Sequence, residues 1–279
     1  MIVLVFGYGF IGAAFAAAAR EAGHDIAATI RTPKRRRLLE PLGVTAVPAG
    51  NVRAMARAVR NAGAILVTPP PDDAGCPAYA ALSSLDLSGK WIGYLSTTGV
   101  YGDRDGGWVF EDSTRQPGSV EGRRRVLAEN QWLSKGAHVF RLPGLYGPGR
   151  NVIERLRDGT ARRIHKDGHV FSRLHHDDCA SALLASLDRP SAGGIYNLCD
   201  DEPAAADEVL AWAAREFGFD LPPPIAWDDP ALSPTARRFY QDNKRVSNAR
   251  AKAALGWRPA YPTYREGLRA IFNASFRLN

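Results

Sequence analysis

The chain has 279 residues, of which 45% are hydrophobic and 23% are charged, and its formal net charge is +7 at pH 7. This balance supports a buried core and excludes disordered, collagen-like and repetitive chains. The three cysteines are an odd number without the spacing of metal ligands, so we expect no disulfide framework, no metal site and a reducing, cytoplasmic location. The positive charge favours an anionic partner, such as a phosphorylated cofactor, an anionic substrate or a nucleic acid.

Residues 1–19 carry no charge, a pattern shared by membrane-spanning helices and signal peptides. Glycines interrupt this run, and no basic residue precedes it. We therefore expect no membrane association.

The same stretch carries a glycine motif. An apolar run over 2–6 predicts a buried strand, and glycines at 7, 9 and 12 lead into an alanine-rich segment without a helix breaker. A dinucleotide pyrophosphate needs this arrangement, because the first glycine allows a tight turn, the second lets backbone approach the phosphates and the third allows close helix packing. The helix N-terminus then offers free N–H groups to the anion. The residues expected at the cofactor are Gly7, Tyr8, Gly9, Phe10, Ile11 and Gly12.

Basic residues follow the second predicted strand, 25–30. A carboxylate at this strand end would bind the ribose 2′-hydroxyl of NAD, whereas an arginine can hold the 2′-phosphate of NADP. Arg31 occupies the position, with Thr32 next and Lys34 or Arg35 as helpers, so we predict NADP as the preferred cofactor and NAD as the alternative. Because no helix-turn-helix or aromatic platform accompanies the run, we expect no nucleic-acid partner.

Further short strands are predicted over 44–47, 64–67, 91–95 and 138–141, each separated from the next by room for a helix. This alternation predicts an α/β fold with a doubly wound parallel Rossmann sheet, in which ligands bind beyond the carboxyl ends of the strands. We expect a dinucleotide-binding domain over 1–145 and a mixed region over 146–279, which completes the sheet and forms a smaller C-terminal substrate lobe. The residues after the strands that we assign to the cofactor are Thr68, Pro69, Pro70, Ser96, Pro143 and Leu145.

Six strings follow one another along the chain: GYGFIG, LSTTGVYGD, RLPGLYGPGR, FSRLHHDD, YNLCDDEP and AKAALGW. Together they resemble the extended short-chain dehydrogenase/reductase superfamily, whose members are NAD(P)-dependent epimerases, dehydratases and reductases that often act on sugar nucleotides. The glycine spacing departs from the usual extended form, which indicates an atypical subgroup.

The resemblance implies a catalytic group that this chain carries in part. Thr97 matches the family's serine or threonine that holds the substrate oxygen. The family's tyrosine and lysine align with Glu121 and Arg125 when its helix glutamate is placed on Glu129, so neither matches. Arg125 could still hold the cofactor ribose, although it cannot shuttle protons. Tyr101, or alternatively Glu121, would have to supply the proton, and a packed aromatic is the other interpretation of Tyr101.

Three residues are assigned to the substrate: Thr98, Arg150 and Arg173, the last of which resembles the arginine that binds a substrate diphosphate in the superfamily. The run 175–178, His-His-Asp-Asp, is interpreted as the cap of a helix over 177–187, with Asp177 or Asp178 as the N-cap, and not as a metal site. We expect an oxidoreductase or epimerase that acts on a polar, anionic carbonyl or alcohol substrate. The alternative is a non-catalytic NADP-binding redox sensor or scaffold, and a homodimer is left open.

Overall fold

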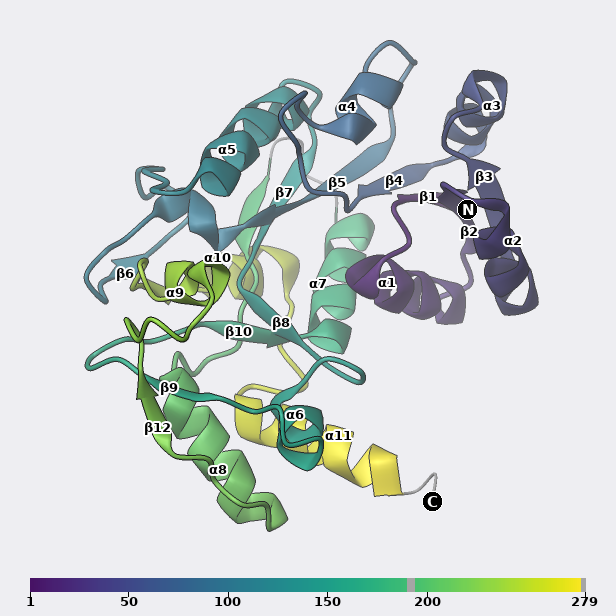
Figure 1. Ribbon diagram of the computed structural model, residues 1–279. Helices are drawn as coiled ribbons and strands as arrows, with labels where there is room; N and C mark the ends of the chain where they lie inside the picture. Colours follow the sequence, from purple (N-terminus) through teal and green to yellow (C-terminus); the bar gives the residue numbers. More distant parts are fainter. Residues whose placement is uncertain (190–193, 277–279) are drawn as a thin grey trace.

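The computed structural model describes residues 1–189 and 194–276. Its centre is a sheet of seven strands, all paired in parallel, which confirms the predicted doubly wound fold (Figure 1). In sheet order the strands are β11 (Ile195–Asn197), β7 (His138–Leu142), β5 (Trp91–Thr97), β4 (Ala64–Val67), β1 (Ile2–Phe6), β2 (Asp25–Ile30) and β3 (Val44–Pro48). The order reverses between β1 and β4, and in sheets of this kind that switch point is where ligands bind.

Helices cover both faces of the sheet because each strand buries side chains on both sides (Figure 1). Val3 and Val5 of β1 pack into one core cluster, and Leu4 and Phe6 pack into the other. The helices on the first face are α1 (Phe10–Glu21), α7 (His176–Asp188) and α10 (Ala249–Leu255), and those on the second are α3 (Val52–Asn61), α4 (Pro77–Leu82) and α5 (Val120–Leu133). Helix α2 (Pro33–Leu39) joins β2 to β3, followed by a 3₁₀ turn, Glu40–Leu42.

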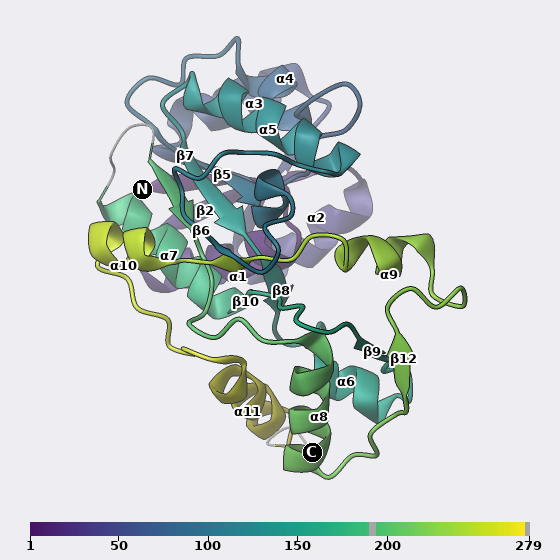
Figure 2. The same ribbon diagram turned by 90° about the vertical axis from the view of Figure 1, so that its left-hand side faces the viewer.

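A second lobe lies beside the sheet and has its own apolar core (Figure 2). Its helices are α6 (Val152–Arg157), α8 (Ala206–Phe217), α9 (Pro234–Phe239) and α11 (Tyr264–Phe276). Two pairs of short parallel strands accompany them: β8 (Gly144–Tyr146) with β10 (Arg173–His175), and β9 (Arg163–His165) with β12 (Pro224–Ala226). A third pair, β6 (Trp108–Val109) with β13 (Arg245–Val246), packs instead against the 3₁₀ turn Thr98–Tyr101 that follows β5. Residues beyond 146 thus contribute both to the sheet and to this lobe.

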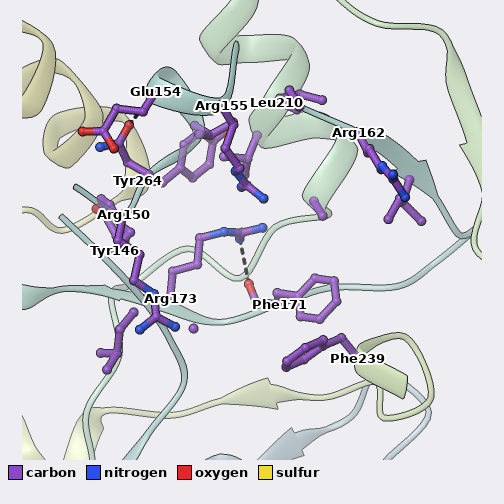
Figure 3. Close-up of a pocket in the computed structure, with 18 of the residues that line it drawn as sticks. Tyr146, Arg150, Glu154, Arg155, Arg162, Phe171, Arg173, Leu210, Phe239 and Tyr264 are labelled. Atoms are coloured by element: carbon purple, nitrogen blue, oxygen red, sulfur yellow. Dashed lines mark hydrogen bonds between the residues drawn. The ribbon is translucent and has the colours of Figure 1, made fainter. Parts of the chain in front are cut away.

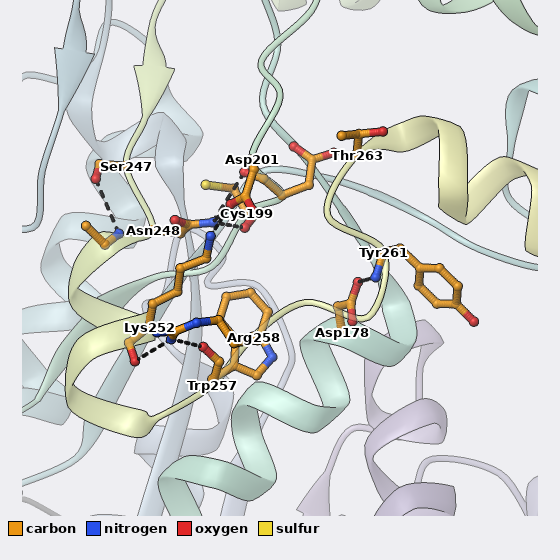
Figure 4. A network of polar contacts seen from close by, with 12 residues as sticks. Asp178, Cys199, Asp201, Ser247, Asn248, Lys252, Trp257, Arg258, Tyr261 and Thr263 are labelled. Carbon is orange, nitrogen blue, oxygen red and sulfur yellow. Dashed lines mark hydrogen bonds and ion pairs between the residues drawn. The ribbon is translucent and has the colours of Figure 1, made fainter.

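The start of α7 corrects the predicted cap. The helix begins at His176, and its N-cap is His175, whose Nδ1 accepts a hydrogen bond from the Asp177 N–H at 3.3 Å. Asp178 is buried instead and accepts hydrogen bonds from the backbone N–H groups of Ala260 and Tyr261, at 2.6 and 3.1 Å (Figure 4). The carboxylate therefore fastens the C-terminal segment to the sheet domain.

Among the helices of residues 1–189 and 194–276, none has both the length and the apolar character needed to cross a bilayer.

Candidate functional site

The glycine-rich turn joins β1 to α1 at the switch point. Gly7 has φ of +99°, a backbone conformation that side chains disfavour, and its N–H donates to Thr29 Oγ1 at 2.9 Å. Thr68 Oγ1 donates to the Gly7 carbonyl at 2.7 Å. A Cβ on Gly7 would lie 2.4 Å from Thr68 Oγ1. Thr68 therefore fixes the shape of the turn, and its hydroxyl proton is already used.

The other two glycines have different surroundings. A Cβ on Gly12 would lie 2.4 Å from the Gly7 carbonyl oxygen, so Gly12 is required for packing within the turn. A Cβ on Gly9 would have no described atom within 4 Å apart from its chain neighbours, and Gly9 is the N-cap of α1 without a side chain to cap it. The structure thus leaves open space beside the first turn of α1, where N–H groups face outward. A pyrophosphate fits this space and these donors.

The remaining side chains of the turn divide between core and surface. Ile11 is 5% exposed and belongs to the core, so it could contact a cofactor only through its backbone. Tyr8 and Phe10 are half-buried. Pro69 and Pro70 follow Thr68, and Pro69 lies 3.0 Å from a Cβ built on Gly7. The two prolines thus lie beside the glycine turn, directly after the carboxyl end of β4.

The basic residues after β2 are fully available. Arg31, Thr32, Lys34 and Arg35 are all exposed, and none of their side chains forms a hydrogen bond or ion pair within the described chain. Arg31 directly follows the carboxyl end of β2, at the edge of the crevice. This position is compatible with a contact to the ribose of a bound nucleotide.

Ser96, near the end of β5, and Thr98, directly after it, are both buried. Ser96 is buried and its hydroxyl donates to Glu129 Oε1 at 2.6 Å, so, like Ile11, it could contact a cofactor only through its backbone. Thr98 is 8% exposed in the 3₁₀ turn Thr98–Tyr101, so little of its side chain is available to a substrate. Leu145 is half-buried and lines the cavity described below, and Pro143 is half-buried between β7 and β8.

Thr97 retains a usable hydroxyl. It is half-buried at the end of β5, and its Oγ1 accepts a hydrogen bond from the Gly99 N–H at 3.1 Å. The hydroxyl proton has no acceptor among the described residues. Thr97 can therefore still donate to an oxygen placed in the crevice.

The position of Tyr101 corrects the proton-donor assignment. Its ring is 0% exposed, and the hydroxyl donates to Asn197 Oδ1 at 2.7 Å while accepting from Arg141 Nη1 at 2.8 Å. Burial also raises the pKa of the phenol, although the neighbouring guanidinium opposes that shift. A phenol with both hydrogen-bonding roles filled and no exposure cannot reach a substrate, so Tyr101 is a packed aromatic.

Glu121 and Arg125 lie on α5 but face different neighbours. The Glu121 carboxylate is exposed and forms an ion pair with Arg238 of α9 at 3.0 Å. A hydrogen bond from its own backbone N–H, together with Arg238, lowers the pKa of Glu121, opposite to what a general acid at neutral pH needs. Arg125 Nη1 donates to the Leu95 carbonyl, and to the Tyr94 hydroxyl at 3.2 Å, so its guanidinium is held against β5.

A basic cavity of about 870 Å³ opens in the second lobe (Figure 3). Four arginines line it: Arg150, Arg155, Arg162 and Arg173. Two carboxylates, Glu154 and Asp158, also line it, so cations outnumber anions. The aromatic lining residues are Tyr146, Phe171, Phe239, Tyr240 and Tyr264. This lining suits a ligand that carries negative charge and a flat or apolar part.

The arginines differ in burial and in what they contact. Arg173 Nη1 donates to the carbonyls of Phe171 and Ala204, both at 2.9 Å, and burial lowers the pKa of its guanidinium (Figure 3). Arg150 is exposed, and its guanidinium lies 5.5 Å from the ring centroid of Phe10, the first residue of α1. Arg150 thus stands between the glycine turn and the cavity.

Arg155 and Arg162 were missed at the sequence level. Both lie in the arginine-rich stretch 155–163, shortly after the RLPGLYGPGR string, and this proximity was the available signal. Nothing in the stretch indicates that α6 and the approach to β9 turn both side chains toward one cavity.

His175, His176 and Asp177 come within 4.8 Å of one another through potential ligand atoms. His175 Nδ1 is already used to cap α7, and burial lowers the pKa of His175 to about 4, so the imidazole is neutral. The absence of a metal here remains a prediction.

A scan against protein-family models finds no match. The chain is 40% identical to a functionally unknown conserved protein from Silicibacter pomeroyi DSS, over 98% of each chain, with a TM-score of 0.89. The two proteins belong to one family. Among curated proteins, a 3-diazoavenalumate denitrifying reductase from Streptomyces sp is 35% identical over 144 residues, which are 47% of this chain and 45% of that protein. The chain spans about half the length of the curated relatives it matches.

More distant solved structures share the fold. DesIV, a dTDP-glucose 4,6-dehydratase from Streptomyces venezuelae solved with NAD and TYD bound, is 20% identical over 100% of this chain and 98% of its own, with a TM-score of 0.80. The resemblance to the extended short-chain dehydrogenase/reductase superfamily is thereby confirmed for the fold.

Proposed function

We propose that this protein is an NAD(P)-dependent oxidoreductase or epimerase that acts on a polar, anionic carbonyl or alcohol substrate. The observation that carries the proposal is the placement of a glycine turn with open space at Gly9 beside a cavity lined by four arginines. Arg150, which lies over Phe10 and also lines the cavity, makes the two sites neighbours. A cofactor and an anionic substrate could therefore meet at the switch point.

The cofactor would be held by the chain's own backbone. The turn from Gly7 to Gly12 and the first N–H groups of α1 would bind the pyrophosphate, and Arg31 would bind a 2′-phosphate. Nicotinamide, when bound, supplies or accepts a hydride. Support comes from the NAD present in the DesIV structure and from the reductase name of the Streptomyces relative.

Thr97 would hold the reacting oxygen of the substrate, because its hydroxyl proton is free while its oxygen accepts from Gly99. Arg173, which is half-buried, and Arg155 and Arg162, which are exposed, would bind the anionic part from the cavity lining. Arg125 would order the end of β5 and with it Thr97, since it donates to the Leu95 carbonyl. The proton would come from a group other than Tyr101.

A second candidate is a non-catalytic sensor that binds NADP. It is favoured by one specific observation: Tyr101 is buried and Glu121 is paired with Arg238, so neither expected donor faces the crevice. This alternative keeps the cofactor site and removes the reaction.

A turnover screen tests the proposal. Oxidation of NADPH and NADH would be followed by absorbance with a panel of aldehydes, ketones and nucleotide sugars, each anionic compound matched to a neutral analogue. Gly9→Val serves as the control that should lose cofactor binding. We expect turnover with anionic members only. Cofactor binding without any turnover would favour the sensor, and absence of cofactor binding would contradict both functions.

A further inference from the structure

Asp200 is a buried carboxyl whose backbone is hydrogen-bonded to that of Arg173, a residue that lines the cavity. It follows β11, is 2% exposed, and its backbone N–H donates to the Arg173 carbonyl at 2.7 Å. Neither carboxyl oxygen has a hydrogen-bond partner of normal geometry among the described residues, although the backbone N–H groups of Glu202 and Arg173 lie beside it. An ionised carboxylate in such a place is costly unless a cation or a proton compensates it.

Arg173, which also lines the cavity, is the cation that most strongly lowers the pKa of Asp200. No ion pair within 4.0 Å joins the two side chains in the described chain, and Arg173 Nη1 is used by two backbone carbonyls. The other titratable groups facing Asp200 are Tyr146 of β8 and the two residues that flank Asp200 in the chain, Cys199 and Asp201. The Tyr146 hydroxyl is likewise buried without a hydrogen-bond partner among the described residues. Asp200 and Arg173 therefore interact through space across a poorly solvated region.

Asp201, the next residue, shows what a paired carboxylate looks like here. Its Oδ1 accepts from Asn248 Nδ2 at 2.7 Å and forms an ion pair with Lys252 of α10 (Figure 4). The charge of Asp201 is thus compensated by Lys252. Asp200, by contrast, has no ion-pair partner of its own among the described residues, so its protonation depends on Arg173 and on what binds to Arg173.

We propose that Asp200 takes up a proton when an anion binds to Arg173, so that protonation of Asp200 and occupancy of the cavity are thermodynamically coupled. The inference rests on the proposed function in so far as the natural anion is the substrate. Under this proposal Asp200 is a positioning residue. It does not touch the ligand, but its protonation state determines the net positive charge that Arg173 presents to the ligand.

Burial supports the coupling, since it raises the pKa of Asp200 to about 8 even though Arg173 lowers it. Below that pH Asp200 is neutral, and the Arg173 charge is available to a ligand. Above that pH the ionised carboxylate partly cancels the positive charge of Arg173. Binding of an anion is then opposed by repulsion from the carboxylate unless Asp200 takes up a proton at the same time. Linkage requires the reciprocal effect, in which a bound anion raises the pKa of Asp200 further.

Carbon-13 NMR of labelled aspartate carboxyls tests this directly. The Asp200 signal, assigned by its loss in Asp200→Asn, would be followed from about pH 5 to about pH 10 with and without saturating sulfate, which stays a dianion over this range. We expect a midpoint near 8 without sulfate and a rise of about one pH unit with it, which equals about a tenfold change in sulfate affinity. Asp201→Asn, the matched control, removes a neighbouring negative charge that raises the pKa of Asp200, so the Asp200 midpoint should fall somewhat while its sulfate-induced rise is retained.

Arg173→Met should abolish the sulfate-induced shift, and this outcome would support the coupling through Arg173. A midpoint near the ordinary value for aspartate, or one that sulfate leaves unmoved in the wild-type protein, would overturn the inference. These results are distinguishable from the proposed function. A sulfate-linked midpoint without turnover of any substrate would support the inference and contradict the enzyme, whereas turnover of an anionic substrate with an unmoved midpoint would do the reverse.

Discussion

At the scale of single residues, Glu129 shows why several conspicuous polar side chains serve the fold. Its carboxylate is 0% exposed and accepts from Ser96, from Arg141 and from Arg115. Arg141 extends the cluster to the Tyr101 hydroxyl. A buried carboxylate without such partners would be strongly unfavourable, so the cluster must stay complete. It ties α5 to β5 and β7, and it holds Ser96 and Tyr101 away from the crevice.

This reasoning predicts the effect of Tyr101→Phe. Removal of the hydroxyl leaves Asn197 Oδ1 without its donor and Arg141 without one acceptor, so the free energy of unfolding should fall by about 1–3 kcal/mol. Cofactor affinity should not change, because the ring keeps its packing. Urea unfolding and fluorescence titration with NADPH measure the two quantities. Tyr79→Phe, which removes a hydroxyl with no hydrogen bond among the described residues, is the control. A fully stable Tyr101→Phe protein with lost turnover would restore a catalytic role.

Arg31 carries the prediction on cofactor choice. An exposed charge-assisted contact to a 2′-phosphate is worth about 1.5–3 kcal/mol, so Arg31→Ala should weaken NADP binding by about one to two decades and leave NAD binding almost unchanged. Calorimetric titration with both cofactors measures this. Arg37→Ala, on the exposed surface of α2, is the control for general loss of charge. Equal affinities for the two cofactors in the wild-type protein would contradict the assignment.

At the scale of elements, the glycines of the β1–α1 turn serve two different requirements, folding of the turn and approach of a ligand, which the sequence motif alone does not distinguish. Gly7 and Gly12 are required by the protein itself, since Thr68 Oγ1 and the Gly7 carbonyl fill the places of their absent side chains. Gly9 is surrounded by open space, so the protein alone does not require it. A ligand that approaches the backbone is the physical reason for a glycine there.

The turn therefore predicts opposite outcomes for two substitutions. Gly12→Ala places Cβ 2.4 Å from the Gly7 carbonyl and 3.1 Å from Val5 Cγ1, so it should destabilise the fold by about 1–3 kcal/mol. In Gly9→Val the added Cβ has no described atom within 4 Å apart from its chain neighbours, so the fold should survive while NADPH binding is lost. Thermal unfolding and NADPH titration of both variants check this. Normal cofactor affinity in a folded Gly9→Val protein would show that the motif is an ordinary turn.

At the scale of the whole molecule, the chain crosses between its parts more than once. Helix α7 packs beside α1 under the sheet, and Leu183 of α7 shares a core cluster with Phe15 of α1. Strand β11 completes the sheet next to β7. Both elements follow residue 146, so the sheet depends on the second half of the chain.

Residues 1–145 alone should accordingly fail to fold. Without α7 and β11, the apolar surface of Phe15, Ala16 and Phe140 would be exposed to water, at about 25 cal/mol per Å². We expect no cooperative thermal transition in circular dichroism and poor dispersion in proton NMR. The full chain, measured in the same way, is the control. A cooperative transition of the fragment would show that residues 1–145 form an independent domain.

The sequence by itself determined the features that depend on neighbouring residues. Strands were predicted from apolar runs, their parallel arrangement from alternation with helices, and the β1–α1 turn from glycine spacing, because local sterics and side-chain periodicity decide each of them. The roles of Tyr101 and Ser96 could not be read in this way. Their hydroxyls are claimed by Asn197, Arg141 and Glu129, which are far away along the chain.

Tertiary structure alone decided what the substrate side offers. Arg155 and Arg162 meet Arg150 and Arg173 because α6 and the segments around β9 and β10 fold around one cavity. Asp200 acquires its unusual environment because the segment after β11 is buried and hydrogen-bonded to the backbone of Arg173. The electrostatic energy of a charged side chain depends on its burial and on the charges near it. Both are decided only when segments distant in the sequence pack together.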